Sequence, residues 1–191
     1  MLEKYQRNYS TIILVACIVS FILQSIIPLY PGILILHPDY VLSMPWTLVT
    51  YLFLHGSFGH LFFNMLFMFF FAPELERRVG SKTFLTIYLL SGIVAGIGHL
   101  ITSENPVVGA SGALFGVFAC LAIIAPDIRA YIYFIPMKIT HAVILFAVMD
   151  ILFIGAGDMV ARTAHLSGLF VGIVYGMRLK KLQLERYNRM I

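Results

Sequence analysis

The sequence predicts an all-α polytopic membrane protein, a bundle of six membrane-spanning helices. Apolar residues make up 60% of the 191 residues, whereas Asp, Glu, Lys and Arg make up 12%, which is about half the charged share of a soluble domain. Six apolar stretches approach the ~20 residues that a helix needs to cross a bilayer. With six spans, almost all basic residues fall on one side of the membrane. We therefore expect a single membrane domain over residues 1–191 with short loops.

The predicted spans differ in how they begin. The first lacks a small-residue cleavage site and runs directly into the protein, which favours a span over a cleaved signal. The third and fifth are apolar runs, and the fifth contains Asp150, an acid for which the sequence names no partner. The second, fourth and sixth begin with polar and small residues. The six spans cover about Tyr9–Pro28, Phe58–Ala72, Phe84–Ile101, Ala110–Ala125, Thr140–Ile154 and Ala161–Leu179.

The basic residues indicate how these spans are oriented. Six spans place both termini on the same side of the membrane as the second and fourth loops, and Arg162 alone on the other side. Because basic residues concentrate on the cytoplasmic side, both termini are expected to be cytoplasmic. The residues on that side are Lys4, Arg7, Arg77, Arg78, Lys82, Arg129, Lys138, Arg178, Lys180, Lys181, Arg186 and Arg189.

Composition also indicates which classes of binding partner to expect. The net charge of +4 fits this topology and attraction to anionic membrane lipid, and no basic patch interleaved with aromatic residues indicates nucleic acid. Cys17 and Cys120 fall inside predicted spans, which argues against a disulfide or a metal cluster. We expect neither a metal nor a cofactor.

Four polar residues are predicted to lie at one depth near the external face. The second, fourth and sixth spans all run from outside to inside, and their first turns carry His60 and Asn64, Ser111, and His165, respectively. His60 and Asn64 are four residues apart and share a helix face. Polar side chains at this depth are expected to face the bundle interior, because exposing them to lipid is costly.

Glycines allow two of these helices to pack closely. Gly112 and Gly116 in the fourth span, and Gly168, Gly172 and Gly176 in the sixth, recur at helical spacing. Such small-residue stripes let helix backbones approach one another in membranes. We expect this packing to bring Ser111 and His165 within hydrogen-bond reach.

This arrangement suits nucleophilic catalysis. A serine hydroxyl needs a base to accept its proton as it attacks, and the imidazole of His165 can serve. Donors for an oxyanion would be the Ser111 N–H at a helix N-terminus, the Asn64 amide and the His60 ring. No acidic residue is evident as a third member, so we expect a Ser–His dyad, with Phe115 packed against the imidazole.

These motifs resemble those of the rhomboid family of intramembrane serine proteases, and the resemblance covers essentially the whole chain. The family motifs are all matched, in the correct order along the chain. His-x-x-x-Asn is matched by His60 and Asn64 with His55 upstream, and Glu-x-x-x-Gly by Glu76 and Gly80. Gly-x-Ser-Gly is matched by Gly109-Ala110-Ser111-Gly112, and Ala-His-x-x-Gly-x-x-x-Gly by Ala164, His165, Gly168 and Gly172.

The resemblance implies an endopeptidase whose catalytic residues are Ser111 and His165, acting on single-span membrane proteins. It implies a long first loop, residues 30–57, and makes the fifth helix and the loop beyond it candidates for the element that opens to admit substrate. A six-span core without further domains indicates a prokaryotic cytoplasmic membrane. Two residues depart from the family pattern: Thr47 follows Trp46 where arginine is common, and Phe115 stands where tyrosine is frequent.

Other functions fit the sequence less well. Gly155-Ala156-Gly157-Asp158 fits the Gly-x-Gly-Asp pattern of intramembrane aspartyl proteases, but that chemistry needs two carboxylates sharing a proton. Zinc proteolysis would need a His-Glu-x-x-His motif. A small transporter usually shows an internal repeat and broken helices near the midplane. A catalytically inactive rhomboid-like binding protein would be expected to lack the serine or the histidine.

Overall fold

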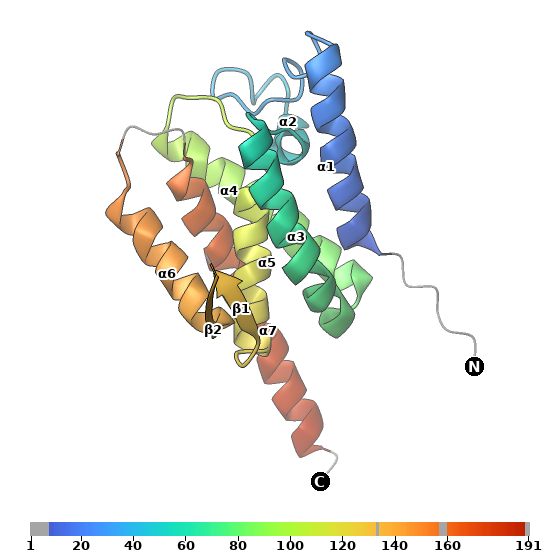
Figure 1. Ribbon diagram of the computed structural model, residues 1–191, viewed down its shortest axis with the longest axis vertical. Helices are drawn as coiled ribbons and strands as arrows, with labels where there is room; N and C mark the ends of the chain where they lie inside the picture. The colour runs from blue at the N-terminus through green and yellow to red at the C-terminus, as the bar shows by residue number, and fades with distance from the viewer. Residues whose placement is uncertain (1–7, 133, 157–159, 190–191) are drawn as a thin grey trace, which may run out of the picture.

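The computed structural model describes residues 8–132, 134–156 and 160–189, which form a helical bundle with one short hairpin (Figure 1). The long helices run alternately up and down, and α3, α5 and α7 all begin at the end that carries the first loop. The described elements are α1 Tyr9–Ile26, α2 Thr47–Thr50, the 3₁₀ turn η1 Tyr51–Phe53, α3 Phe58–Val79, α4 Ser81–Thr102, α5 Ser111–Ile124, β1 Arg129–Ile132, β2 Ile135–Lys138, α6 Ile139–Leu152 and α7 Arg162–Asn188.

Six helices coincide with the six predicted spans, with differences at their ends. Within the described residues, α1, α3 and α4 are long and apolar enough to cross a membrane, and α5 and α6 are shorter apolar helices. The helix α3 continues through Pro73 to Val79, beyond the expected end at Ala72, and stops at Gly80, whose φ of 84° suits glycine. The last helix continues to Asn188, well past Leu179. The count of six spans stays a prediction.

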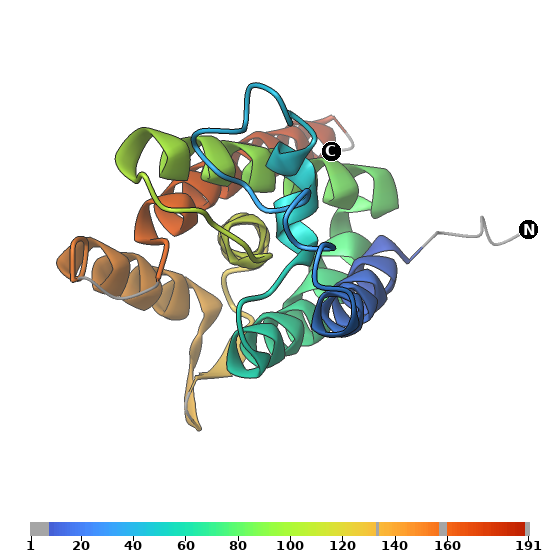
Figure 2. The same ribbon diagram turned by 90° about the horizontal axis from the view of Figure 1, so that it is seen from above.

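The helix α5 lies at the centre of the bundle, surrounded by the other long helices (Figure 2). From Gly112 to Ala122 every residue except Phe115 is buried. A helix that is apolar on all sides lies either in a protein core or in lipid, and the burial of α5 places it in the core of this bundle. The N-terminal end of α5, where Ser111 stands, is therefore held by contacts along the rest of the helix.

The backbones of α5 and α7 touch through their glycines. A Cβ atom placed on Gly168 would overlap the carbonyl oxygen of Gly112, and one on Gly172 would overlap that of Gly116. A Cβ on Gly176 would lie 3.0 Å from Ile123. The predicted close packing of the two glycine stripes is confirmed, and it fixes the register between the helix carrying Ser111 and the helix carrying His165.

The start of α1 is anchored by a buried carboxylate. Glu76 of α3 accepts hydrogen bonds from the N–H groups of Tyr9 and Ser10, at 2.8 and 2.9 Å. These are first-turn amides, which have no acceptor within their own helix. Arg77 pairs instead with Glu74, so the buried Glu76 carboxylate serves mainly to dock α1 on α3.

A two-stranded antiparallel hairpin was not expected from the sequence. Strands β1 and β2 pair Arg129 with Lys138 and Ile132 with Ile135 in the connection between α5 and α6. Along β1, Ala130 and Ile132 are buried while Arg129 and Tyr131 are exposed, so the strand lays one face against the bundle. The fold is thus all-helical apart from this connection.

The first loop is tied to the rest of the protein by several hydrogen bonds. The Trp46 indole donates to the Ile33 carbonyl at 2.8 Å, and the Thr50 hydroxyl donates to the Leu34 carbonyl at 2.9 Å. Tyr51 is buried and donates its hydroxyl proton to the Gly92 carbonyl of α4 at 2.7 Å. The loop is therefore a packed cap over one end of the bundle.

We predict that Gly168→Ala lowers the stability of the protein. The new methyl group would overlap the α5 backbone, and forcing extra volume into a packed interior costs about 1–3 kcal/mol. Thermal unfolding in detergent measures the change. Gly59→Ala is the matched control, because nothing lies within 4 Å of a Cβ at that helical position. Equal melting temperatures for both variants would contradict the packing argument.

Candidate active site

Ser111 is the first residue of α5 and follows a sharp turn. Gly109 has a φ of 123°, a conformation that favours glycine, and its N–H donates to the Tyr51 carbonyl at 2.9 Å. Gly109 therefore forms the tight turn that leads into α5. As a first-turn amide, the Ser111 N–H has no acceptor within its helix, and the helix dipole favours negative charge beside it.

His165 lies in the first turn of α7 and meets Ser111 directly. Its Nε2 atom is 2.8 Å from the Ser111 Oγ, a hydrogen-bond distance. The Phe115 ring stacks on the imidazole with centroids 4.3 Å apart and planes 12° apart. The juxtaposition of the serine and histidine and the packing of Phe115 were both expected from the sequence, and both are found.

His165 also contacts an acidic residue that the sequence did not predict as its partner. The Nδ1 atom of His165 lies 3.1 Å from Oδ2 of Asp150 on α6. The other carboxylate oxygen lies 4.0 Å from Nε of Arg162. The expectation that no acid stands beside the pair is wrong, because it rested on sequence patterns that do not register α6 against α7. One feature of the sequence did point to this contact, because an acidic side chain in a membrane span needs a polar partner.

Asn64 and His60 lie on α3 on the other side of Ser111. Asn64 is buried and donates one amide proton to the His60 carbonyl at 2.8 Å. The His60 ring lies against Gly109, where a Cβ atom would stand 2.6 Å from its Cε1. The three predicted groupings from the second, fourth and sixth spans thus gather around the turn that leads into Ser111.

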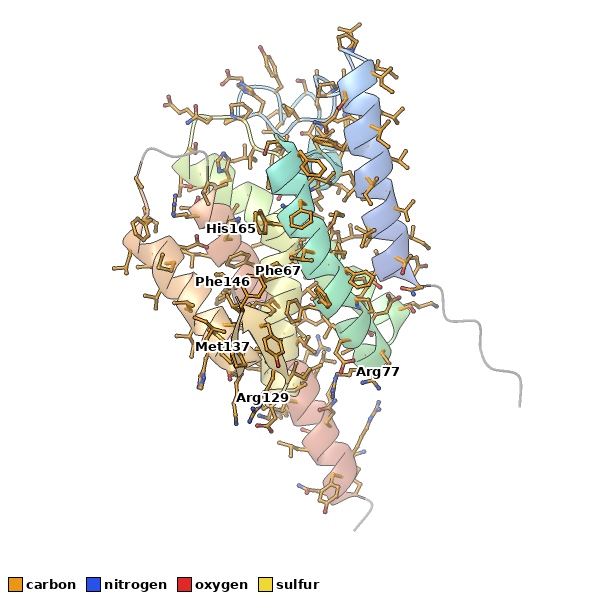
Figure 3. All side chains as sticks on the ribbon, viewed as in Figure 1. Phe67, Arg77, Arg129, Met137, Phe146 and His165 are labelled. Atoms are coloured by element: carbon orange, nitrogen blue, oxygen red, sulfur yellow. The ribbon has the colours of Figure 1, made fainter. Side chains whose placement is uncertain are left out.

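An apolar pocket of about 160 Å³ opens beside Ser111 between α3, α5 and α6. Figure 3 shows His165, Phe67 and Phe146 close together in this region. The rings of Phe67 and Phe146 have centroids 5.7 Å apart. The pocket is lined by Phe63, Asn64, Phe67, Ser111, Leu114, Phe115, Phe118 and Phe146.

His55 supports the site from the first loop. Its side chain is buried and packs edge-on against the His60 ring, with centroids 5.2 Å apart. The Gln24 side chain donates to the His55 carbonyl at 2.7 Å and accepts from its N–H. Burial, followed by the charge of nearby His60, lowers the pKa of His55 to about 4, so this imidazole is neutral at pH 7. His55 therefore acts as a packing residue behind His60.

The aspartyl-protease alternative would use Asp158, with Asp150 as the second carboxylate. Asp158 lies outside the residues that the structure describes. Asp150 is bonded to His165, which leaves it as part of the Ser–His cluster. The geometry favours chemistry centred on Ser111.

Comparison with known proteins places the chain in a family. The Rhomboid domain model matches residues 42–182. The candidate rhomboid protease YdcA of Bacillus subtilis is 48% identical over 75 residues, 38% of each chain. Rhomboid protease GluP of the same organism is 33% identical over 127 residues, 66% of this chain and 24% of GluP. The mitochondrial Rhomboid protein 1 of Saccharomyces cerevisiae is 28% identical over 170 residues, 82% of this chain and 48% of that protein.

The chain therefore matches about a quarter to a half of the length of these curated relatives. The family model, in contrast, covers most of the chain and contains every residue of the site described above. Together with the long apolar helices, this identifies an integral membrane protein. The chain belongs to the rhomboid family.

Proposed function

We propose that this protein is an intramembrane serine endopeptidase in which Ser111 and His165 form the reacting pair. The observation that carries the proposal is the 2.8 Å contact between the Ser111 Oγ and the His165 Nε2 beside an apolar pocket. Acyl transfer needs a nucleophile that is hydrogen-bonded to a base, with backbone N–H groups nearby to bind the oxyanion. An inactive binding protein or a transporter would have no use for this contact.

The proposed reaction proceeds in two halves. The Ser111 Oγ attacks the scissile carbonyl carbon while His165 Nε2 accepts the hydroxyl proton. The tetrahedral intermediate collapses, the C–N bond breaks, and the imidazolium returns the proton to the leaving amine. Water then attacks the acyl-enzyme with His165 again as base, which releases the acid product and restores Ser111. The two residues thus serve both halves of the cycle, without a metal or a cofactor.

Negative charge on the substrate oxygen is stabilised by donors from two helices. The Ser111 N–H lies at the α5 N-terminus, and the Asn64 amide lines the same pocket. One Asn64 proton is committed to the His60 carbonyl, but an amide nitrogen carries two, so the second serves the oxyanion. The His60 ring, against Gly109, is the third donor of the proposed oxyanion hole.

The proposed substrates are single-span membrane proteins, cleaved near the external face. The pocket beside Ser111 is lined mostly by phenylalanines, which suits an apolar side chain next to the scissile bond. The site lies at the end of the bundle where α3, α5 and α7 begin, and the distribution of basic residues predicts that this end is external, with both termini in the cytoplasm. A peptide bond must leave its helix to reach Ser111, so locally unstable helices are favoured.

We predict that Ser111→Ala and His165→Ala each reduce kcat by at least about 10³-fold, because removing either partner of such a pair removes most of the catalysis. Cleavage of a single-span reporter in liposomes measures this. Ser25→Ala and His141→Ala remove exposed residues of the same types and are expected to retain wild-type rates. A fluorophosphonate should label wild type but not Ser111→Ala. Undiminished cleavage by either site variant would refute the proposed pair.

We predict that Asn64→Ala lowers kcat about 10²–10³-fold with little change in KM. Removing one oxyanion donor from a serine protease lowers kcat by about this factor, because the donor stabilises the transition state and not the bound substrate. The hydrogen bond that Asn64 makes is to its own helix, so the melting temperature should change little. A variant whose kcat stays within threefold of wild type would exclude Asn64 from the oxyanion hole.

A further inference from the structure

The helix α6 buries an acid and exposes several of its apolar residues. Its only buried residues are Ile139, Ala142 and Asp150, whereas Val148, Met149, Ile151 and Leu152 are exposed. This pattern fits a helix that faces lipid on most sides. An ionisable side chain in such a helix is costly unless it has a polar partner, and it therefore indicates a function.

The two oxygens of Asp150 face two residues of α7. Oδ2 lies 3.1 Å from His165 Nδ1, within hydrogen-bond range, and Oδ1 lies 4.0 Å from Arg162 Nε, at the outer limit of an ion pair. The contact with the imidazole is the closer of the two. The opposite ring nitrogen of the same imidazole faces the Ser111 Oγ, so the three side chains form a continuous chain.

We propose that Asp150 is a positioning residue that orients the His165 imidazole for proton transfer from Ser111. The inference rests on the proposed protease function and adds a third member to the Ser–His pair. An ionised carboxylate only accepts hydrogen bonds, so Nδ1 must carry the proton that it donates to Asp150. The lone pair is thereby placed on Nε2, facing the Ser111 hydroxyl. The carboxylate also stabilises the imidazolium that forms during attack.

The stacking of Phe115 on His165 does not achieve this orientation. Stacked planes 12° apart fix the plane of the imidazole. A ring rotated by 180° about its Cβ–Cγ bond would lie in the same plane and stack equally well. Such a turned ring would present carbon atoms instead of nitrogen atoms to Asp150 and Ser111. A carboxylate distinguishes the two orientations because it bonds strongly to an N–H group. Phe115 and Asp150 thus supply complementary restraints.

A purely structural role for Asp150 makes a different prediction. If Asp150 serves only to join α6 to α7 through Arg162, removal of either partner should have the same effect. Arg162→Gln breaks the ion pair between these helices and leaves the contact of His165 with Asp150 in place. Comparison of Asp150→Asn with Arg162→Gln therefore separates orientation of the base from attachment of the helix.

We predict that Asp150→Asn lowers kcat about 10²–10⁴-fold, with KM within about threefold of wild type. The amide is nearly isosteric but can donate to Nδ1, which favours the tautomer that cannot accept the serine proton. Arg162→Gln should retain kcat within about threefold. Asp150→Glu keeps a carboxylate and should recover at least tenfold over Asp150→Asn. The assay is cleavage of the single-span reporter in liposomes, with melting temperatures in parallel.

A spectroscopic readout tests the orientation without substrate. Nitrogen-15 and proton NMR of histidine-labelled protein in detergent micelles reports which ring nitrogen carries the proton. The His165 signals are assigned by their absence from His165→Gln. Wild type should show the proton on Nδ1, and Asp150→Asn should show it on Nε2.

The possible outcomes distinguish the inference from the proposed function. Wild-type kcat in Asp150→Asn, or an equal loss of kcat in Asp150→Asn and Arg162→Gln with the proton still on Nδ1, would overturn the positioning role and leave the protease function intact. Cleavage that persists in Ser111→Ala would instead refute the proposed function. The NMR comparison would then still decide whether Asp150 sets the His165 tautomer.

Discussion

The direct contact between the backbones of α5 and α7 is the constraint on which the site depends. Because Gly112 and Gly168 have no side chains to separate the two helices, the helices meet at a fixed depth and rotation. Ser111 and His165 stand at the ends of these helices where that contact begins. A displacement of one helix by a single residue would move their side chains apart by about 1.5 Å along the axis and 100° around it. The contact between Ser111 and His165 is thus a consequence of helix packing.

Two groups of polar side chains inside the bundle pair with neighbouring polar groups. Ser111, His165 and Asp150 form a chain that ends near Arg162, and each member occupies a donor or acceptor of the next. An isolated member would carry the full cost of burial in an apolar medium. Glu76 follows the same rule at the other end of the bundle, where it accepts the first-turn amides of α1. These contacts fix how α1 and α6, the peripheral helices, attach to the core.

The sequence predicted the features that depend on local pattern. Apolar runs located the spans, and the spacing of glycines from Gly168 onward identified the packed face of α7. The sequence did not predict features that depend on how helices far apart in the chain pack against one another. The partnership of Asp150 with His165 requires the rotation of α6 against α7, which no periodicity in either helix contains. The extension of α3 past Pro73 requires tertiary contacts, because Leu75 and Glu76 are buried against the bundle and compensate for one lost backbone hydrogen bond.

If Asp150 orients His165 as proposed, its position on α6 links access to the pocket with orientation of the base. The same helix supplies Phe146, which lines the pocket beside Ser111, and Asp150, which holds His165. An outward movement of α6 would widen the pocket and withdraw the carboxylate from the imidazole together. If substrate enters beside Phe146, the base is fully oriented only after α6 returns to its packed position. A peptide that holds the helix away would then meet a serine whose base lacks its second hydrogen bond.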